Sequence, residues 1–386
     1  MNLMLTRTPA EEALGVTLPN RREEDWKWTD LKRMISGVYA KAIVAVKPND
    51  VERLIKSSPF NSVKSQRIVF VNGELERKHS SFKGLKVETS LPANISDGTV
   101  IAMNTTLAAE GVTLRFDTNT DQPVELLHIV TDGNARAIAT RHRIEVAKGA
   151  SATIIETHIG EGDYLANAVT DYTIADGARL DRVKVERESN KATHLSHVTM
   201  TLGKNAIVRD VTFTSGAALN RQNGSITFKG EGGDAHVSGA YLLSGTQHAD
   251  TKLVIDHSVP RCTSRELFKC VMDGKSRGIF QGKAIVRPGA QKTDGKQSSH
   301  ALLLSEMAEF DAKPELEIYA DDVICGHGAT SGDLNHDHLF YLKSRGIPEA
   351  EARSMLVQAF VSEAFDNVEH EGIRDALLGL VHGSAA

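Results

Sequence analysis

Cysteine is scarce in this chain of 386 residues, which contains only Cys262, Cys270 and Cys325. An odd and sparse set argues against a disulfide framework and is typical of a protein of the reducing cytoplasm. The chain has no Cys-x-x-Cys pair and no Walker-type GxxxxGK[ST] motif. We therefore do not expect this chain to hydrolyse ATP by itself.

Long apolar runs and an excess of positive charge are also missing. No stretch of about 18 apolar residues is present, so no transmembrane helix is expected. The first residues, MNLMLTRTPAEEALG, lack the apolar core of a signal peptide, which again indicates the cytoplasm. The net charge of −5 provides no overall basic field, so we expect neither nucleic acid nor a membrane surface as a partner.

Aromatic residues make up only 5% of the chain, whereas glycine is abundant at 31 residues. From Val112 to about residue 330 the pattern is almost wholly that of short strands. The turns between these strands carry Gly149, Gly177, Gly203 and Gly230, which recur about every 27 residues. Such a repeat without helices between the strands indicates a β-solenoid, in which each coil stacks on the next. A β-sandwich is the alternative, but sandwiches seldom keep a fixed turn spacing.

The ends of the chain are expected to be helical and to close the solenoid. We divide the sequence into a helical and mixed region at 1–110, a solenoid core at 111–332 and a helical region at 333–386. In the last region, the helix that starts at Pro348 is apolar over so wide an arc that it must bury more than one side. One side can lie on the solenoid, and the other needs either the following helix or another chain.

The segment 314–346 carries the most reactive residues of the sequence. Its first part, PELEIYADDVICGHG, is predicted to be a strand, TSGD a turn, and LNHDHLFYLKSRG the start of a helix. Cys325 and His327 are two positions apart, so in a strand they lie on the same face. A thiolate and an imidazole side by side suit a soft metal or an iron–sulfur cluster, although two ligands do not complete a site. The alternative is that Cys325 is a small buried apolar residue and His327 belongs to a turn.

The remaining candidates for chemistry are weaker. Cys262 and Cys270 flank SRELFK, which is predicted to be helical, and their spacing fits no metal motif. The sequence does not exclude a catalytic pair of carboxylates, and many β-solenoids cleave polysaccharides with such acidic pairs. The acidic residues here mostly alternate with basic ones, and there are few aromatic residues for stacking on sugars. A β-helix enzyme that acts on polysaccharide is therefore kept as the alternative function.

Three long segments resemble the SufB/SufD family of scaffold proteins, which belong to the Suf system of iron–sulfur cluster assembly. They are RREEDWKWTDL near the N-terminus, GIFQGKAIVRPGAQKTDGKQSSHALLLSE at 278–306 and PELEIYADDVICGHGATSGDLNHDHLFYLKSRGI at 314–347. Within this family the chain resembles the SufD type. The SufB type is longer and carries a Cys-rich N-terminal motif, whereas no cysteine precedes Cys262 here.

The resemblance implies a mainly β fold, with a right-handed parallel β-helix between helical N- and C-terminal regions. It implies a scaffold without catalytic activity that pairs with a SufB-type paralogue and binds a SufC-type ABC ATPase, with a homodimer as the alternative state of the chain alone. The isolated chain would hold no cofactor stably, and a transient cluster would form at the paralogue interface, with Cys325 and His327 as candidate iron ligands. Gly326 stands between them where the family more often has Ser. The residues expected at the ATPase interface are Phe340, Leu356, Phe360 and Phe365.

Overall fold

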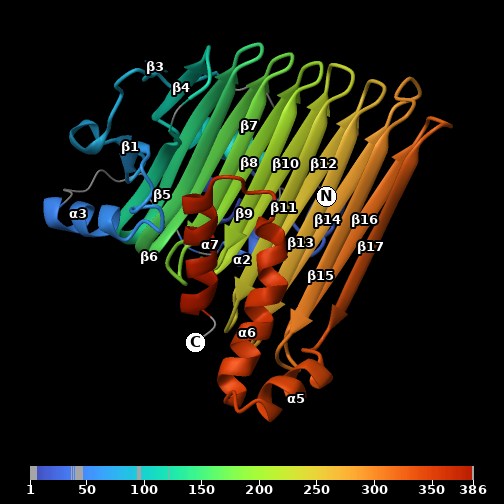
Figure 1. The fold of residues 1–386 in the computed structure, drawn as a ribbon. Helices are drawn as coiled ribbons and strands as arrows, with labels where there is room; N and C mark the ends of the chain where they lie inside the picture. The colour runs from blue at the N-terminus through green and yellow to red at the C-terminus, as the bar shows by residue number, and fades with distance from the viewer. Residues whose placement is uncertain are drawn as a thin grey trace, which may run out of the picture.

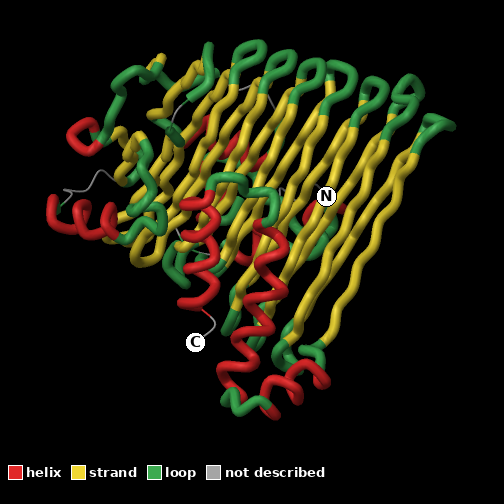
Figure 2. Tube along the Cα trace, viewed as in Figure 1, coloured by secondary structure: helices red, strands yellow, loops and turns green. Residues whose placement is uncertain are grey.

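The computed structural model of the protein describes residues 7–35, 37, 39, 47–93, 97–120 and 122–384, without the side chains of residues 132–135, 383 and 384. It is a long stack of parallel strands, and its helices belong to the N- and C-terminal parts of the chain (Figure 1). The stack is a parallel β-solenoid of about eight turns, which confirms the predicted fold class against the β-sandwich. Figure 2 shows that strands fill the body, whereas the helices lie around it.

The N-terminal part combines short helices with the first strands. Its elements are α1 (Pro9–Leu14), a 3₁₀ turn (Glu24–Trp26), α2 (Leu31–Met34), α3 (Pro48–Lys56), β1 (Gln66–Val71), β2 (Glu74–Leu75), a 3₁₀ turn (Arg77–His79), β3 (Lys86–Glu88), α4 (Thr99–Leu107) and β4 (Glu110–Phe116). Part of the region that we predicted to be helical and mixed, at 1–6, 36, 38, 40–46 and 94–96, lies outside the described residues.

The coils of the solenoid begin with two long strands, β5 (Val124–Val146) and β6 (Ser151–Ile174). The later coils alternate between two sheets. One sheet continues from β6 through β8 (Thr193–Leu202), β10 (Leu219–Phe228), β12 (His248–His257), β14 (Arg277–Val286) and β16 (Glu309–Ile318). The other continues through β7 (Arg179–Arg187), β9 (Ile207–Thr214), β11 (Asp234–Leu243), β13 (Thr263–Met272), β15 (Asp294–Leu303) and β17 (Ile324–Gly332).

The turn glycines serve two different purposes. Gly149 and Gly177 have φ values of 71° and 66°, a backbone conformation that glycine adopts without strain. Gly203 does not, and in its turn Asn205 takes the left-handed conformation with φ 53°. A Cβ on Gly203 would lie 2.6 Å from Asp176 Oδ1, so glycine is needed there for the close approach of the neighbouring coil.

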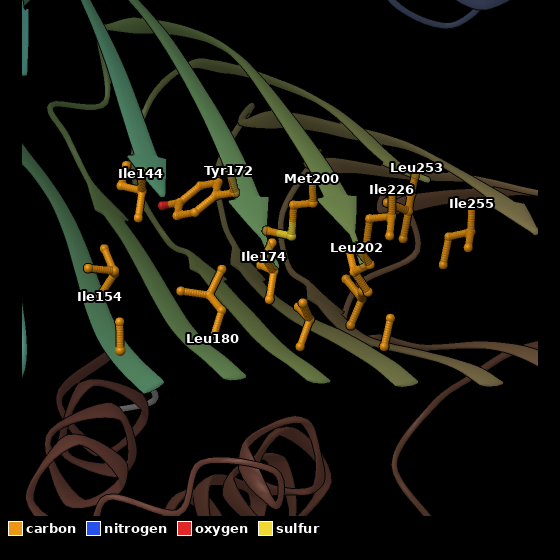
Figure 3. Packing of buried hydrophobic residues seen from close by; sticks show 14 of the residues in the cluster. Ile144, Ile154, Tyr172, Ile174, Leu180, Met200, Leu202, Ile226, Leu253 and Ile255 are labelled. Carbon is orange, nitrogen blue, oxygen red and sulfur yellow. The ribbon is translucent and has the colours of Figure 1, made fainter. Parts of the chain in front are cut away.

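The interior of the solenoid holds the main apolar core. Alternate residues of each strand point inward, and the parallel register stacks them in columns from coil to coil. Figure 3 shows one such column, in which Ile144, Tyr172, Met200, Ile226 and Ile255 follow one another as Cα partners. All five are nearly inaccessible to solvent, and each such side chain contributes about 1.5–3 kcal/mol through burial.

A second core lies outside the solenoid, between its β7–β13 sheet and the C-terminal helices (Figure 1). These are α5 (His336–Ser344), α6 (Glu349–Ser362), a 3₁₀ turn (Glu363–Phe365) and α7 (Glu371–Ser384). Val357 and Val361 of α6 pack with Val183 and Val211 of the sheet and with Ile373 of α7. The outer face of the solenoid and the following helix α7 therefore both cover α6, and together they bury much of its apolar surface. Among the described residues, no helix is long and apolar enough to cross a membrane.

Three local predictions were wrong. The turn predicted at TSGD is absent, because Thr330 and Gly332 still pair with β15 as part of β17. SRELFK is not helical but lies in β13, where Ser264, Glu266 and Phe268 point inward and Arg265 outward. Because the inward positions of this strand carry both polar and apolar residues, the sequence does not show the alternation of apolar and polar residues that is typical of a strand. PELEIYADDVICGHG is not one strand either, because the chain turns between β16 and β17 at residues 319–323. The predicted helix start was correct, since the Asn335 side chain accepts hydrogen bonds from Asp337 N and His338 N.

Candidate functional site at the open end of the solenoid

The C-terminal helices do not close the solenoid as expected, because α6 and α7 pack on the outer face of the β7–β13 sheet. The last coil therefore leaves the solenoid open at one end. In the described part of the chain, β16 pairs only with β14, and β17 only with β15. The outer edges of both strands therefore have free backbone donors and acceptors. Large apolar residues lie exposed along this coil, namely Met307, Ile318, Tyr319 and Ile324, of which Ile324 is 67% exposed. An exposed apolar strand edge of this length is a surface that pairs readily with another chain.

Cys325 and His327 lie on β17 and share the face that continues the solenoid interior. Cys325 is the Cα partner of Gly295 on β15, and His327 is the Cα partner of Gln297. These partners align in turn with the inward residues of β13. The structure thus brings the thiol and the imidazole together at the rim of the open end, about 7 Å apart along the strand.

The environments of the two side chains differ. Cys325 is half-buried, and burial raises the pKa of its thiol above the ordinary value, although a backbone hydrogen bond from Gly295 opposes the shift. A metal ion would therefore have to displace a proton from Cys325 in order to bind. His327 is exposed at the rim. The described residues contain no group of three or more His, Cys, Asp or Glu arranged to hold a metal ion, so Cys325 and His327 do not make a complete metal site by themselves.

The interior behind this pair is polar, which the sequence reasoning missed. Gln297 on β15 and Glu266 on β13 are Cα partners and continue the column of His327. Both are buried, at 2% and 3% exposure. The only sequence signal would have been the strand alternation in SRELFK, which we interpreted as a helix. Knowing the register between coils was necessary to align Glu266 with His327.

Deeper coils also hold buried charges, but those are paired. Arg182 Nε lies 2.8 Å from Glu156 Oε1, and its Nη1 lies 2.7 Å from Asp210 Oδ1. His194 lies between Glu186 and Glu188 at 2.8 and 2.7 Å. Burial by itself would lower the pKa of His194, but the two carboxylates raise it to about 9. These groups form neutralised networks and therefore serve the fold.

The four apolar residues expected at a partner interface are placed very differently. Phe340 on α5 is 74% exposed. Leu356 and Phe360 on α6 are half-buried, and Lys269 Nζ lies 4.6 Å above the Phe360 ring. Phe365 is 1% exposed and packs against Phe213 with ring centroids 6.1 Å apart, so in this conformation it is not accessible to another chain.

The sequence reasoning also missed two further exposed apolar residues on the adjacent helices α5 and α6. Tyr341 of α5 is 56% exposed, and Met355 of α6 is 42% exposed. Helix α5 lies below the lower ends of the strands in Figure 1, past the point where β17 ends. An exposed apolar patch on two adjacent helices is typical of a protein interface.

Comparisons with known proteins agree with this architecture. The family model described as SUF system FeS cluster assembly, SufBD core domain, matches residues 128–360. The chain is 29% identical to the iron–sulfur cluster assembly protein SufD of Escherichia coli, over 96% of this chain and 90% of that protein. It is 31% identical to a SufBD family protein of Mycobacterium tuberculosis, over 70% of this chain and 69% of that protein. It is 32% identical to protein ABCI7, chloroplastic, of Arabidopsis thaliana, over 62% of this chain and 51% of that protein.

A parallel β-solenoid with an open, Cys- and His-bearing last coil and a helical C-terminus defines the class of the protein. The match to the core model over more than half of the chain shows that the protein belongs to the SufB/SufD family, and the similarity along nearly the whole chain shows that it is of the SufD type.

Proposed function

We propose that this protein is a non-catalytic scaffold subunit of iron–sulfur cluster assembly, on which a nascent cluster forms at an interface with a SufB-type paralogue. The observation that carries the proposal is the position of Cys325 and His327 on the inward face of the last strand, at the open end of the solenoid. Family membership favours this function over the alternative of a polysaccharide enzyme.

Pairing with a paralogue follows from the free edges of β16 and β17. A second solenoid with a similar open end would satisfy their backbone hydrogen bonds and cover Ile318 and Ile324. The paralogue would also bring its own ligands to the rim, which would complete the set that this chain supplies only in part. In the absence of the paralogue, the same edges would pair with a second copy of this chain.

The cluster is cargo in this proposal rather than a resident cofactor. Thiolate sulfur is the usual cluster ligand, whereas imidazole donates less charge to iron. A His327 ligand would therefore hold the cluster less firmly than a fourth thiolate and would ease its release. In this proposal the present chain supplies Cys325 and His327, and the paralogue supplies the ligands that complete the cluster site.

The exposed patch of Phe340, Tyr341 and Met355 is our candidate for the docking site of a SufC-type ABC ATPase. This chain contains no Walker-type motif, so ATP hydrolysis is assigned to that partner. Leu356 and Phe360, which we also expected at this interface, are half-buried beside the patch. Phe365 would support the patch from the core, since it packs beneath α6.

The test is anaerobic reconstitution of the co-expressed three-subunit complex, followed by measurement of bound iron and sulfide. Wild type is compared with His327→Ala and with the control His382→Ala, which removes an exposed histidine of α7. We expect the intact His327→Ala complex to lose its cluster and the control to keep it. A full cluster in the intact His327→Ala complex would refute the assignment of the site.

A further inference from the structure

The residues behind the open end form a continuous column in the solenoid interior. His327 on β17, Gln297 on β15 and Glu266 on β13 are successive Cα partners. Parallel strands are about 4.8 Å apart, so Gln297 lies directly beneath His327, and Glu266 lies about 10 Å beneath it. Nothing in the proposed assembly function yet uses Gln297 or Glu266.

Both buried side chains have unsatisfied polar atoms. In the described part of the chain, none of the four atoms Glu266 Oε1 and Oε2 and Gln297 Oε1 and Nε2 makes a hydrogen bond of normal geometry, although the Gln297 amide is close enough to Glu266 to oppose the rise of its pKa. Buried polar groups are nearly always paired, because an unpaired one loses its hydration without compensation. These four atoms lie in one column, where Gln297 stands between Glu266 and His327 and is placed to bond to both.

The opposite sheet leaves room for the acid. Gly282 on β14 faces Glu266, and a Cβ at that position would lie 3.1 Å from Glu266 Oε2 and 2.9 Å from the Phe280 ring. Any larger residue at position 282 would press on both side chains. The backbone thus accommodates a carboxyl group at a place where an apolar side chain would otherwise fill the core.

The surroundings of Glu266 set its charge. Burial raises the pKa of its carboxyl group to about 8, and Gln297 only partly opposes this shift. Its uncharged neighbours are Val237 of β11, Phe280 and Gly282 of β14, and Gln297 of β15. The nearest titratable side chains in the same column are His327 on one side and Asp210 on the other, two strands away in each direction, and Asp210 is paired with Arg182.

We propose that Glu266 and Gln297 are a positioning pair for the assembly site, in which neutral Glu266 holds the Gln297 amide and Gln297 in turn orients the His327 imidazole. A histidine that binds metal through one ring nitrogen donates the N–H of the other to an acceptor. Gln297 Oε1 is the unpaired acceptor next to His327 in the column, and Gln297 Nε2 can then donate to a carboxyl oxygen of Glu266. The inference rests on the proposed function, because it gives His327 a ligand role.

Neutral Glu266 has a second consequence for the site. A cluster with thiolate ligands is an anion, and a carboxylate about 10 Å away in the low-dielectric interior would repel it. At a pH below the pKa of Glu266, its carboxyl group is neutral and does not repel the cluster. At a pH above this pKa, the negative carboxylate disfavours retention of the cluster. Cluster binding is thus expected to weaken as the pH rises through about 8.

The coupling is measurable in the metal-free chain. The full chain is labelled with ¹³C histidine, and the His327 resonance is identified by its absence in His327→Ala. In a titration from about pH 6 to about pH 10, the wild-type His327 shift is expected to show a step with its midpoint near 8, where Glu266 ionises. Glu266→Gln is expected to lose this step and Gln297→Leu to weaken it. The control Asp171→Asn, which removes a buried carboxyl group from β6, is expected to keep it.

The outcomes are separable. A wild-type His327 resonance without a step near 8, or a step that persists in Glu266→Gln, would overturn the proposal. The wild-type titration and Gln297→Leu decide the question even if Glu266→Gln does not fold. Because no iron or partner is present, this result is independent of the reconstitution test, and failure of the assembly function would instead appear as a cluster retained by His327→Ala.

Discussion

Replacing Glu266 by glutamine should stabilise the protein, and the gain should grow with pH. Burial raises the pKa of Glu266 from 4.5 to about 8. Below pH 4.5 the carboxyl group is protonated in both the folded and the unfolded chain. Between 4.5 and about 8 the unfolded chain releases the proton and the folded chain keeps it, so stability falls as the pH rises. Above about 8 both forms are ionised, and the penalty remains constant.

The shift gives the size of the effect. One pKa unit corresponds to about 1.4 kcal/mol, so the penalty is about 3 kcal/mol at pH 7 and about 5 kcal/mol above pH 8. Glutamine has nearly the same shape and cannot ionise, so the Glu266→Gln variant escapes the whole penalty. Its advantage over wild type in the free energy of unfolding should therefore be small near pH 4.5 and largest above pH 8.

Urea unfolding followed by circular dichroism at a series of pH values measures this advantage. Asp171→Asn is the matched control, because burial raises the pKa of Asp171 only from 3.8 to about 6. Its advantage should stop growing near pH 6, whereas that of Glu266→Gln should grow up to about pH 8. A Glu266→Gln advantage that does not change with pH, or that stops growing at the same pH as the control, would refute the electrostatic reasoning.

Three further predictions test the core, the coil packing and the buried charges. Phe365→Ala should cost about 3–5 kcal/mol of stability in urea, whereas Phe340→Ala should change stability by less than about 0.5 kcal/mol and should reduce co-purification of the proposed ATPase partner. Gly111→Ala should cost about 1–3 kcal/mol or more by thermal unfolding, because its Cβ would lie 1.6 Å from a carbonyl oxygen of the neighbouring strand. Glu186→Gln should cost about 3–5 kcal/mol in urea at pH 7, because it leaves the buried His194 cation with one carboxylate fewer.

The fold class was predictable because a solenoid repeats its local chemistry. Gly149 and Gly177 stand at equivalent corners, and a backbone that must turn in the same way at each coil repeats the same residue type. The register was not predictable from that spacing. Thr193 pairs with Leu219, 26 residues later, but Arg277 pairs with Glu309, 32 residues later. Coils of unequal length accumulate offsets that no single period describes.

The candidate site was predictable only as far as one strand reaches. Cys325 and His327 share a face because alternation within a strand is local. Glu266 joins them through two inter-strand registers, and its strand was taken for a helix because polar residues occupy inward positions. Phe365 shows the same limit, since the helical pattern marks it as apolar but cannot say whether the sheet or a partner covers it. The structure places it against Phe213.

The contrast between the two ends of the interior supports a functional origin for the unpaired acid. Several buried charges of the earlier coils have partners inside the protein, as Arg182 has Glu156 and Asp210. Paired charges are compatible with a stable fold, whereas an unpaired buried carboxyl group costs stability that an apolar side chain of similar size would regain. Packing therefore does not account for Glu266, while its place in the column beneath His327 does. Sites where a local rule is broken without a structural gain are where function is expected, and this one lies directly behind the proposed assembly site.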